Sequence, residues 1–300
     1  MKLEASLLLL LCLTPVCLGD PLTYTFTSVP LGMAEGINNS GAMVGWEYGG
    51  AVVAALWANG TLTTLTPPGA FESQAYGISN SGQVVGEYMF NVPEFQPHGF
   101  LYSGGSAGTY TTIDVPDALW TIASGINTRG QIVGTFATAN GASHGFLYQN
   151  GTFTTIDVPG SVFTNVSAIN DLGEIVGQFG YQTNIGYGFL YSNGSYTIFE
   201  QVPGLTAINN LGHFAGDGQV NINGAFIPVG QPPGFVDPVI GGINDSDQLG
   251  VSALTAFRTW DGFLATPVPE PASFLLCAFG LAFAFTILKR AKLRRDSDIQ

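Results

Sequence analysis

Short segments in which bulky and polar residues alternate recur along most of this 300-residue chain. The stretch from Phe153 to Val158 is typical, because Phe153 and Ile156 alternate with threonines before Pro159 ends the run. Period-two alternation predicts half-buried β-strands, and proline is characteristic of strand ends. No window before Ala272 shows sustained helical periodicity. The pattern therefore predicts an all-β domain.

A ten-residue motif of the form Gly/Ala-Ile-Asn-x-x-Gly followed by apolar residues occurs six times, with some variation. Its isoleucines are Ile37, Ile78, Ile126, Ile169, Ile208 and Ile243, spaced 41, 48, 43, 39 and 35 residues apart. Asn, Asp and Gly favour tight turns, so the motif is expected to join the first two strands of each repeat as a hairpin. A Gly-Phe-Leu element and a Thr-rich element follow in most repeats. Four strands per repeat of about 43 residues match a propeller blade.

The two ends of the repeat region look like complementary parts of one blade. Residues 22–30 resemble a fourth strand without its first three, whereas residues 243–265 resemble three strands without a fourth. Pairing them would close a ring without an exposed edge. We therefore expect a six-bladed β-propeller over residues 20–266, with a β-solenoid or paired sandwiches as alternatives. The fourth strand of the fifth repeat, expected near 235–240, is interrupted by Pro238 and preceded by Pro232 and Pro233.

The repeats resemble the HAF-type extracellular repeat, which is named for a His-Ala-Phe triplet. Here the triplet is His98-Gly99-Phe100 and His144-Gly145-Phe146, and it becomes Tyr187-Gly188-Phe189 in the fourth repeat. The resemblance covers roughly residues 22–265 and implies export. It implies no established reaction.

The C-terminus combines a proline-rich stretch over 267–271, an uncharged apolar run over 272–288 and a basic tail over 289–300. As a helix the apolar run would reach roughly 25 Å, the short end of a membrane span, with the basic side cytoplasmic. With Pro269-Glu270-Pro271 at its start, the order of the three parts resembles the PEP-CTERM sorting signal of Gram-negative bacteria. That resemblance implies an exosortase partner, cleavage near the motif and delivery to the cell surface or exopolysaccharide matrix. The alternative is an ordinary single-span anchor.

The N-terminus predicts export as well. Lys2 and an apolar run over 7–13 indicate a secretory signal peptide over 1–19, a helical segment with cleavage between Gly19 and Asp20. A lipoprotein signal through Cys17 is the less favoured alternative, because Val16 stands where a small residue is expected.

Charge and cysteine content restrict the partners of the exported region. Between Asp20 and Glu270 the basic residues are Arg129 and Arg258 against 18 acidic ones, a formal charge of −16. Such a surface repels phosphate backbones and argues against nucleic-acid binding. All three cysteines lie in the signal segment or the apolar tail, so the region is expected to be held by its core without disulfides.

The histidines and carboxylates of the repeats are weak candidates for chemistry. His98 and His144 are expected at strand ends, held apart by the ring, and His213 is expected to be exposed. Paired carboxylates separated by about 5–10 Å could hydrolyse a glycosidic bond, and the candidates are Asp114, Asp157, Glu47 and Glu87. Other residues replace them in the remaining repeats, which favours polar outward positions.

Residues 244–247, Asn-Asp-Ser-Asp, could offer oxygen ligands to Ca²⁺. They lack the spacing of an EF-hand loop, which favours a degenerate hairpin turn. No phosphate loop or dinucleotide fingerprint is present in the sequence. We therefore expect no catalytic residue and no cofactor.

These observations favour an exported, monomeric and non-catalytic surface or matrix protein that engages envelope polysaccharide or another surface protein. The alternative is a secreted carbohydrate-active enzyme with carboxylates at the propeller mouth. A third possibility is that the acidic surface stores divalent cations.

Overall fold

The computed structural model describes residues 22–91, 96–104, 108–182 and 185–268. The predicted signal peptide and the sorting motif from Pro269 onward lie outside these residues, as do the apolar run and the basic tail. In the described ranges there is no helix with the length and apolarity needed to cross a bilayer. Residues Thr23–Pro267 form one compact unit.

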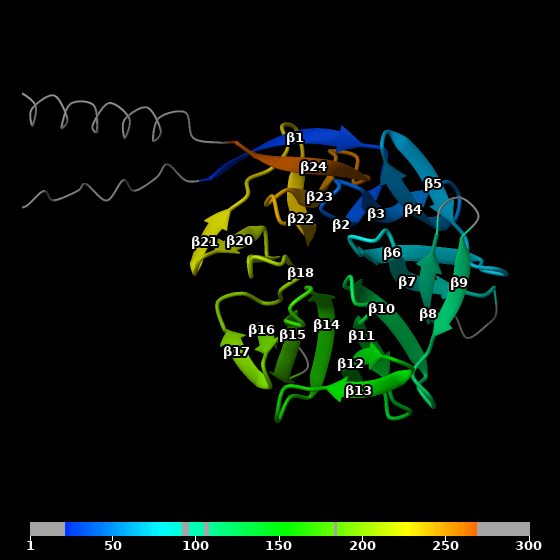
Figure 1. The fold of residues 1–300 in the computed structure, drawn as a ribbon. Helices are drawn as coiled ribbons and strands as arrows, with labels where there is room; N and C mark the ends of the chain where they lie inside the picture. Colours follow the sequence, from blue (N-terminus) through cyan, green and yellow to red (C-terminus); the bar gives the residue numbers. More distant parts are fainter. Residues whose placement is uncertain (1–21, 92–95, 105–107, 183–184, 269–300) are drawn as a thin grey trace, which may run out of the picture. The chain divides into compact units, whose positions relative to one another are not determined.

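This unit consists of six four-stranded antiparallel sheets arranged around a central axis (Figure 1). The first blade contains β2 (Met33–Ile37), β3 (Met43–Tyr48), β4 (Val52–Ala58) and β5 (Thr61–Leu65). The second contains β6 (Glu72–Ile78), β7 (Val84–Met89), β8 (His98–Ser103) and β9 (Thr109–Ile113). The third contains β10 (Trp120–Ile126), β11 (Ile132–Ala137), β12 (Ser143–Gln149) and β13 (Thr152–Ile156). The next two are β14 (Phe163–Ile169), β15 (Ile175–Gln182), β16 (Ile185–Ser192) and β17 (Ser195–Phe199), then β18 (Ala207–Ile208), β19 (Phe214–Gly216), β20 (Gln219–Ile222) and β21 (Ala225–Pro228). The six-bladed all-β prediction is confirmed.

The sixth blade joins the two ends of the repeat region, as the sequence predicted. It contains β22 (Val236–Ile243), β23 (Leu249–Leu254) and β24 (Trp260–Val268), with β1 (Thr23–Val29) as its outermost strand. The hydroxyl of Thr25 also donates to the carbonyl of Thr266 at 3.3 Å. The ring therefore closes by strand pairing between segments that are far apart in the sequence.

The predicted position of the fifth blade's last strand is wrong. That strand is β21, which ends at Pro228, and residues 236–243 form the innermost strand of the sixth blade. Pro232 and Pro233 lie in the connection between the two strands. Pro238 lies inside β22, where the pairing register shifts between Val236 and Val239. Because regular pairing is interrupted there, the backbone N–H that proline lacks is not needed for a hydrogen bond between the strands.

Each Ile-Asn motif forms the predicted hairpin between the first and second strand of a blade. In the fourth blade, the side-chain oxygen of Asn170 accepts the backbone N–H groups of Leu172 at 3.0 Å and Glu174 at 2.9 Å. The turn also needs a residue with positive φ, and Gly173 supplies it at 86°. The asparagine thus holds its own turn together from within.

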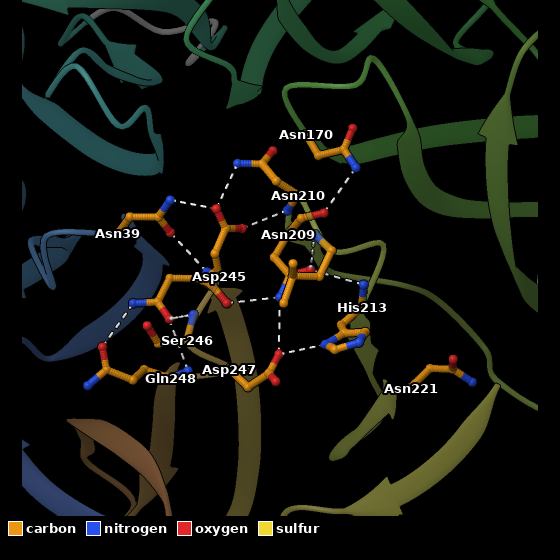
Figure 2. Close-up of polar contacts among 12 residues, drawn as sticks. Asn39, Asn170, Asn209, Asn210, His213, Asn221, Asp245, Ser246, Asp247 and Gln248 are labelled. Atoms are coloured by element: carbon orange, nitrogen blue, oxygen red, sulfur yellow. Dashed lines mark hydrogen bonds and ion pairs between the residues drawn. The ribbon is translucent and has the colours of Figure 1, made fainter. Parts of the chain in front are cut away.

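The same asparagines link neighbouring blades. The side-chain amides of Asn38, Asn127, Asn170, Asn209 and Asn244 each donate to the backbone carbonyl of the equivalent residue in the next blade, at 2.9–3.1 Å. Figure 2 shows part of this asparagine ring, together with a second layer in which Asp245 accepts the backbone N–H of Asn210 at 2.8 Å. In the second blade Ser79 replaces the asparagine and makes no such bond among the described residues.

The hydrophobic core lies between adjacent blades. One cluster combines Val44 and Leu65 of the first blade with Val84 and Phe100 of the second, all fully buried. In the second, third and fourth blades, the phenylalanine of the Gly-Phe-Leu element packs under the glycine of the preceding strand. In the third blade a Cβ at Gly134 would lie 2.0 Å from the carbonyl oxygen of Ile122 and 2.9 Å from the Phe146 ring. Close packing therefore explains why the Val-Gly pair recurs.

Candidate functional site

The innermost strand of five blades carries a β-bulge at the residue two positions before the motif isoleucine. The register shifts enclose Glu35, Tyr76, Ser124, Ser167 and Gly241, and Thr206 occupies the equivalent position in the short fifth blade. A bulge re-aims a side chain that regular pleating would direct elsewhere. These six residues line the same cavity, so every blade contributes one of them to a central channel.

The cavity is widest at the end of the channel where the innermost strands begin. This channel-mouth pocket has a volume of about 410 Å³ and also includes Trp120, Ser143, Asn165 and Val239. It narrows to about 70 Å³ where the channel reaches the six motif isoleucines. A ligand would therefore enter from the mouth and meet a constriction at the level of the isoleucines.

Glu35 is the only carboxylate among the described residues that line the channel-mouth pocket. No described residue donates a hydrogen bond to it, yet part of its side chain contacts the cavity. Because burial penalises the charged form, the pKa of Glu35 is raised from 4.5 to about 7. The pocket therefore changes its charge near neutral pH.

Tyr76 stands beside Glu35 in the ring, and its partners lie behind it. Its hydroxyl donates to Glu87 at 2.8 Å, and the Gln74 side-chain amide donates to the same carboxyl oxygen at 3.2 Å. The other oxygen of Glu87 is buried and has no hydrogen-bond partner among the described residues. Burial raises the pKa of Glu87, which favours its neutral form. Tyr76 therefore lines the cavity while its hydroxyl is held by Glu87.

The remaining lining is polar but uncharged. The hydroxyl of Thr206 donates to the carbonyl of Ile240 at 2.6 Å, which leaves its oxygen lone pairs as acceptors. Ser124, Ser167 and Ser143 are partly exposed. Trp120 begins β10 at the rim and offers a partly exposed aromatic surface. Several hydroxyls, two aromatic rings and one carboxylate suit a ligand with many hydroxyl groups.

The carboxylates nominated from the sequence do not meet in the channel. Asp114 and Asp157 bind the ring nitrogens of His98 at 2.8 Å and His144 at 2.7 Å, and none of these four side chains lines the channel-mouth pocket. The histidines do lie at or near the beginning of β8 and β12, as predicted. The His–Asp partnership was missed. Both residues occur together only in the second and third repeats, which was the available signal.

Three sequence predictions about single residues need correction. Glu87 is buried rather than outward. Its equivalent in the first blade is Trp46 and not Glu47, as the strand register shows: Gln74 pairs with Glu87, and Met33 pairs with Trp46. His213 is buried rather than exposed, with 8% of its surface accessible. Its ring forms a 2.8 Å ion pair with Asp247 across the boundary between the fifth and sixth blades (Figure 2).

Residues 244–247 form the hairpin turn that was preferred over a calcium loop. Asn244 accepts the backbone N–H groups of Ser246 and Gln248, both at 3.0 Å. Among the described residues no group of three His, Cys, Asp or Glu side chains is placed to hold a metal ion. Glu35 was not singled out from the sequence, although it stands at a polar position that varies in an otherwise repeated motif.

Comparison with known proteins identifies no family for the chain. No family model and no curated protein matches it. Similar solved structures include a triple arginine-to-alanine mutant of AofleA from Arthrobotrys oligospora, with 12% identity over 84% of this chain and 91% of that chain and a TM-score of 0.49. An oxidoreductase from Thermus thermophilus described as a glucose dehydrogenase shares 11% identity over 81% and 99% of the two chains, with a TM-score of 0.47. A Trypanosoma rangeli sialidase in complex with difluorosialic acid shares 9% identity over 83% and 54%, with a TM-score of 0.44.

Proposed function

We propose that the protein is a non-catalytic, glycan-binding β-propeller of the cell surface or exopolysaccharide matrix. The observation that carries the proposal is the composition of the channel-mouth pocket. A single carboxylate, Glu35, stands among hydroxyl groups from several blades and beside the aromatic rings of Tyr76 and Trp120. Sugars offer hydroxyl groups for such acceptors and apolar C–H faces for such rings, so the ligand class is a neutral saccharide.

The same composition argues against glycoside hydrolysis at this site. Hydrolysis by the common mechanism uses two carboxyl groups on either side of the scissile bond. Among the described residues the pocket supplies one, and Glu87 is turned away behind Tyr76. Binding without turnover is therefore the function that the pocket supports best.

The pKa of Glu35 supplies a specific test. Hydrogen bonds from sugar hydroxyls to an ionised carboxylate are about twice as strong as those to a neutral acid. Affinity for envelope oligosaccharides should therefore rise as the pH increases through about 7. Glu35→Gln should weaken binding at high pH about tenfold and flatten the pH profile. Calorimetric titration measures both.

Glu200→Gln is the matched control, because Glu200 is an exposed carboxylate that does not line the pocket. It should leave affinity and pH profile unchanged. Equal affinity of Glu35→Gln and wild type at every pH would overturn the channel-mouth assignment. Release of cleaved saccharide that stops in Glu35→Gln would overturn the non-catalytic assignment and favour a carbohydrate-active enzyme.

We further propose that the domain is exported and sorted by its C-terminal tail. The support is the sequence alone: the PEP motif at Pro269-Glu270-Pro271, the apolar run and the basic cluster, together with the N-terminal signal segment. Removal of residues 267–300 should release the propeller into the medium, measured by immunoblotting of cells and supernatant. Retention of the truncated protein on the cell surface would refute the sorting role. The intact mass of the mature protein would report whether both ends are cleaved.

A further inference from the structure

A second pocket lies where the sixth blade meets the first. This seam pocket has a volume of about 590 Å³. It is lined by the connection between β1 and β2, the end of β3 and the beginning of β24. It occurs at the same end of the propeller as the channel mouth, because Gly32 in its wall directly precedes β2, where the innermost strand of the first blade begins.

The backbone between the two blades is fixed on both sides. The carbonyl of Leu31 accepts the N–H of Gly262 at 2.7 Å, and the N–H of Gly32 donates to the carbonyl of Trp46 at 3.1 Å. The same Gly32 N–H lies 2.7 Å from a carboxyl oxygen of Glu47. The wall of the seam pocket is therefore held in a defined geometry before any ligand arrives.

The side chains of the seam pocket combine aromatic surface with charge. Trp46 and Trp260 are both partly exposed, and Tyr48 is 74% exposed at the edge. Glu47 and Asp261 contribute two carboxylates. Arg258 adds a donor, and it is one of only two basic residues in the predicted exported region. Aromatic rings, acceptors and a donor thus converge on one space.

The two carboxylates line the same pocket, and the charge of one acts on the other. Burial raises the pKa of Glu47, the hydrogen bond from Gly32 lowers it, and the negative charge of Asp261 raises it further. A ligand that brings hydroxyl groups into this pocket would donate a hydrogen bond to each of the two carboxylates.

The tryptophan that lines the seam pocket on β3 does not recur at the equivalent positions of the other blades. The strand register places Glu87, Thr135, Gln178 and Ser252 at the positions equivalent to Trp46 in other blades. Thr135 and Ser252 use their hydroxyls to accept a backbone N–H of the next blade, at 3.1 Å to Val166 and 2.8 Å to Ala34. The first blade instead has a tryptophan there, which opens toward a pocket.

We propose that the seam pocket is a second, independent glycan-binding site, specific for a neutral pyranose. The sugar ring would stack on Trp260, and its hydroxyls would bond to Glu47, Asp261 and Arg258. This site does not depend on the channel-mouth pocket, since the two share no lining residue. Two sites at one end of the propeller would increase avidity for a polysaccharide chain.

The chain's four tryptophans allow the two sites to be read separately. Trp120 lines only the channel mouth, whereas Trp46 and Trp260 line only the seam. The full chain carrying Trp120→Phe and Glu35→Gln should still show a saturable change in tryptophan fluorescence with short neutral oligosaccharides of hexoses or N-acetylhexosamines. Adding Asp261→Asn should weaken that response at least tenfold, and Trp260→Ala should abolish it.

Two controls make the result decisive. Glu200→Gln, an exposed carboxylate outside both pockets, should have no effect. Asp261→Asn is nearly isosteric and should keep the wild-type melting temperature, so a lost response would not reflect unfolding. The seam proposal is overturned if the Trp120→Phe, Glu35→Gln protein responds to no saccharide in the panel. It is also overturned if choline, an aromatic-cage ligand, binds there in place of sugars. Either result leaves the channel-mouth test, which depends on Glu35, standing on its own.

Discussion

Completing the asparagine ring should stabilise the propeller. Five blades donate an asparagine amide to the next blade, and Ser79 interrupts the series between the second and third blades. The serine hydroxyl accepts the N–H of Gln83 at 3.1 Å, which replaces part of the asparagine's role within its own turn. Among the described residues it makes no hydrogen bond to the carbonyl of Asn127. Ser79→Asn should supply the missing inter-blade bond.

The expected gain follows from the bonds made in the other blades. A net intramolecular hydrogen bond contributes about 0.5–1.5 kcal/mol to stability. Fixing the longer side chain offsets part of this, so we expect about 1 kcal/mol of added stability. For a domain of this size that corresponds to roughly 2–4 °C in melting temperature. Thermal and urea unfolding of the full chain measure it.

The reverse substitution tests the same reasoning from the other side. Asn127→Ser removes amide bonds to Asn170 at 3.0 Å and to Gln131 at 2.7 Å in a buried position. Leaving a buried acceptor unpaired costs about 1–3 kcal/mol. Ser246→Asn, the same chemical change as Ser79→Asn at an exposed turn position, is the control and should be neutral. A folded Ser79→Asn protein with unchanged or reduced stability would refute the inter-blade role of the ring.

Three further outcomes follow from the structure. Gly134→Ala should lose about 3 kcal/mol in urea unfolding, because a Cβ would lie 2.0 Å from a backbone oxygen, whereas Gly49→Ala meets no atom within 4 Å and should be near neutral. Because folding raises the pKa of Glu35, the stability of the protein should fall as the pH rises from about 4.5 to 7. Glu35→Gln should remove about 1–2 kcal/mol of this loss, which melting curves recorded across the same pH range would measure. Asp157→Asn should change stability by less than about 1 kcal/mol, because its 2.7 Å pair with His144 is about one-third exposed, and a larger loss would show that the pair is structural.

The blade count, the hairpins and the ring closure could be read from the sequence because repetition multiplies a weak local signal. One Ile-Asn turn predicts little, but six at similar spacing fix the phase of every strand around them. The fifth blade escaped this reasoning. Its strands are as short as two residues in β18, and the proline-rich segment after Pro228 offered a false strand end.

Side-chain direction was the part that the sequence could not fix. In a regularly alternating strand, the side chain of Glu35 would lie on the other face of the sheet from Ala34 and Gly36. A bulge adds one residue at this position, and the carboxylate lines the channel. Bulges depend on the pairing partner and leave no reliable local pattern. The confusion of Glu47 with Glu87 was avoidable, because Glu87 directly follows its Val-Gly pair whereas Trp46 separates Glu47 from the corresponding pair. Successive residues of a strand point to opposite faces. A shift of one position therefore accounts for the burial of Glu87 and the partial exposure of Glu47.

Both proposed sites lie where the repeats stop being identical. In a closed ring of similar blades, equivalent positions that only support the fold are free to keep the same residue, as the motif isoleucines do. The channel-mouth positions instead hold Glu35, Tyr76 and small hydroxyl residues, and the seam holds Trp46 and Trp260 at positions that no other blade fills with tryptophan. A carboxylate without a hydrogen-bond donor adds nothing to the stability of the fold. Departure from the repeat, combined with exposure in a cavity, therefore separates the residues of the two proposed sites from the blade architecture of this chain.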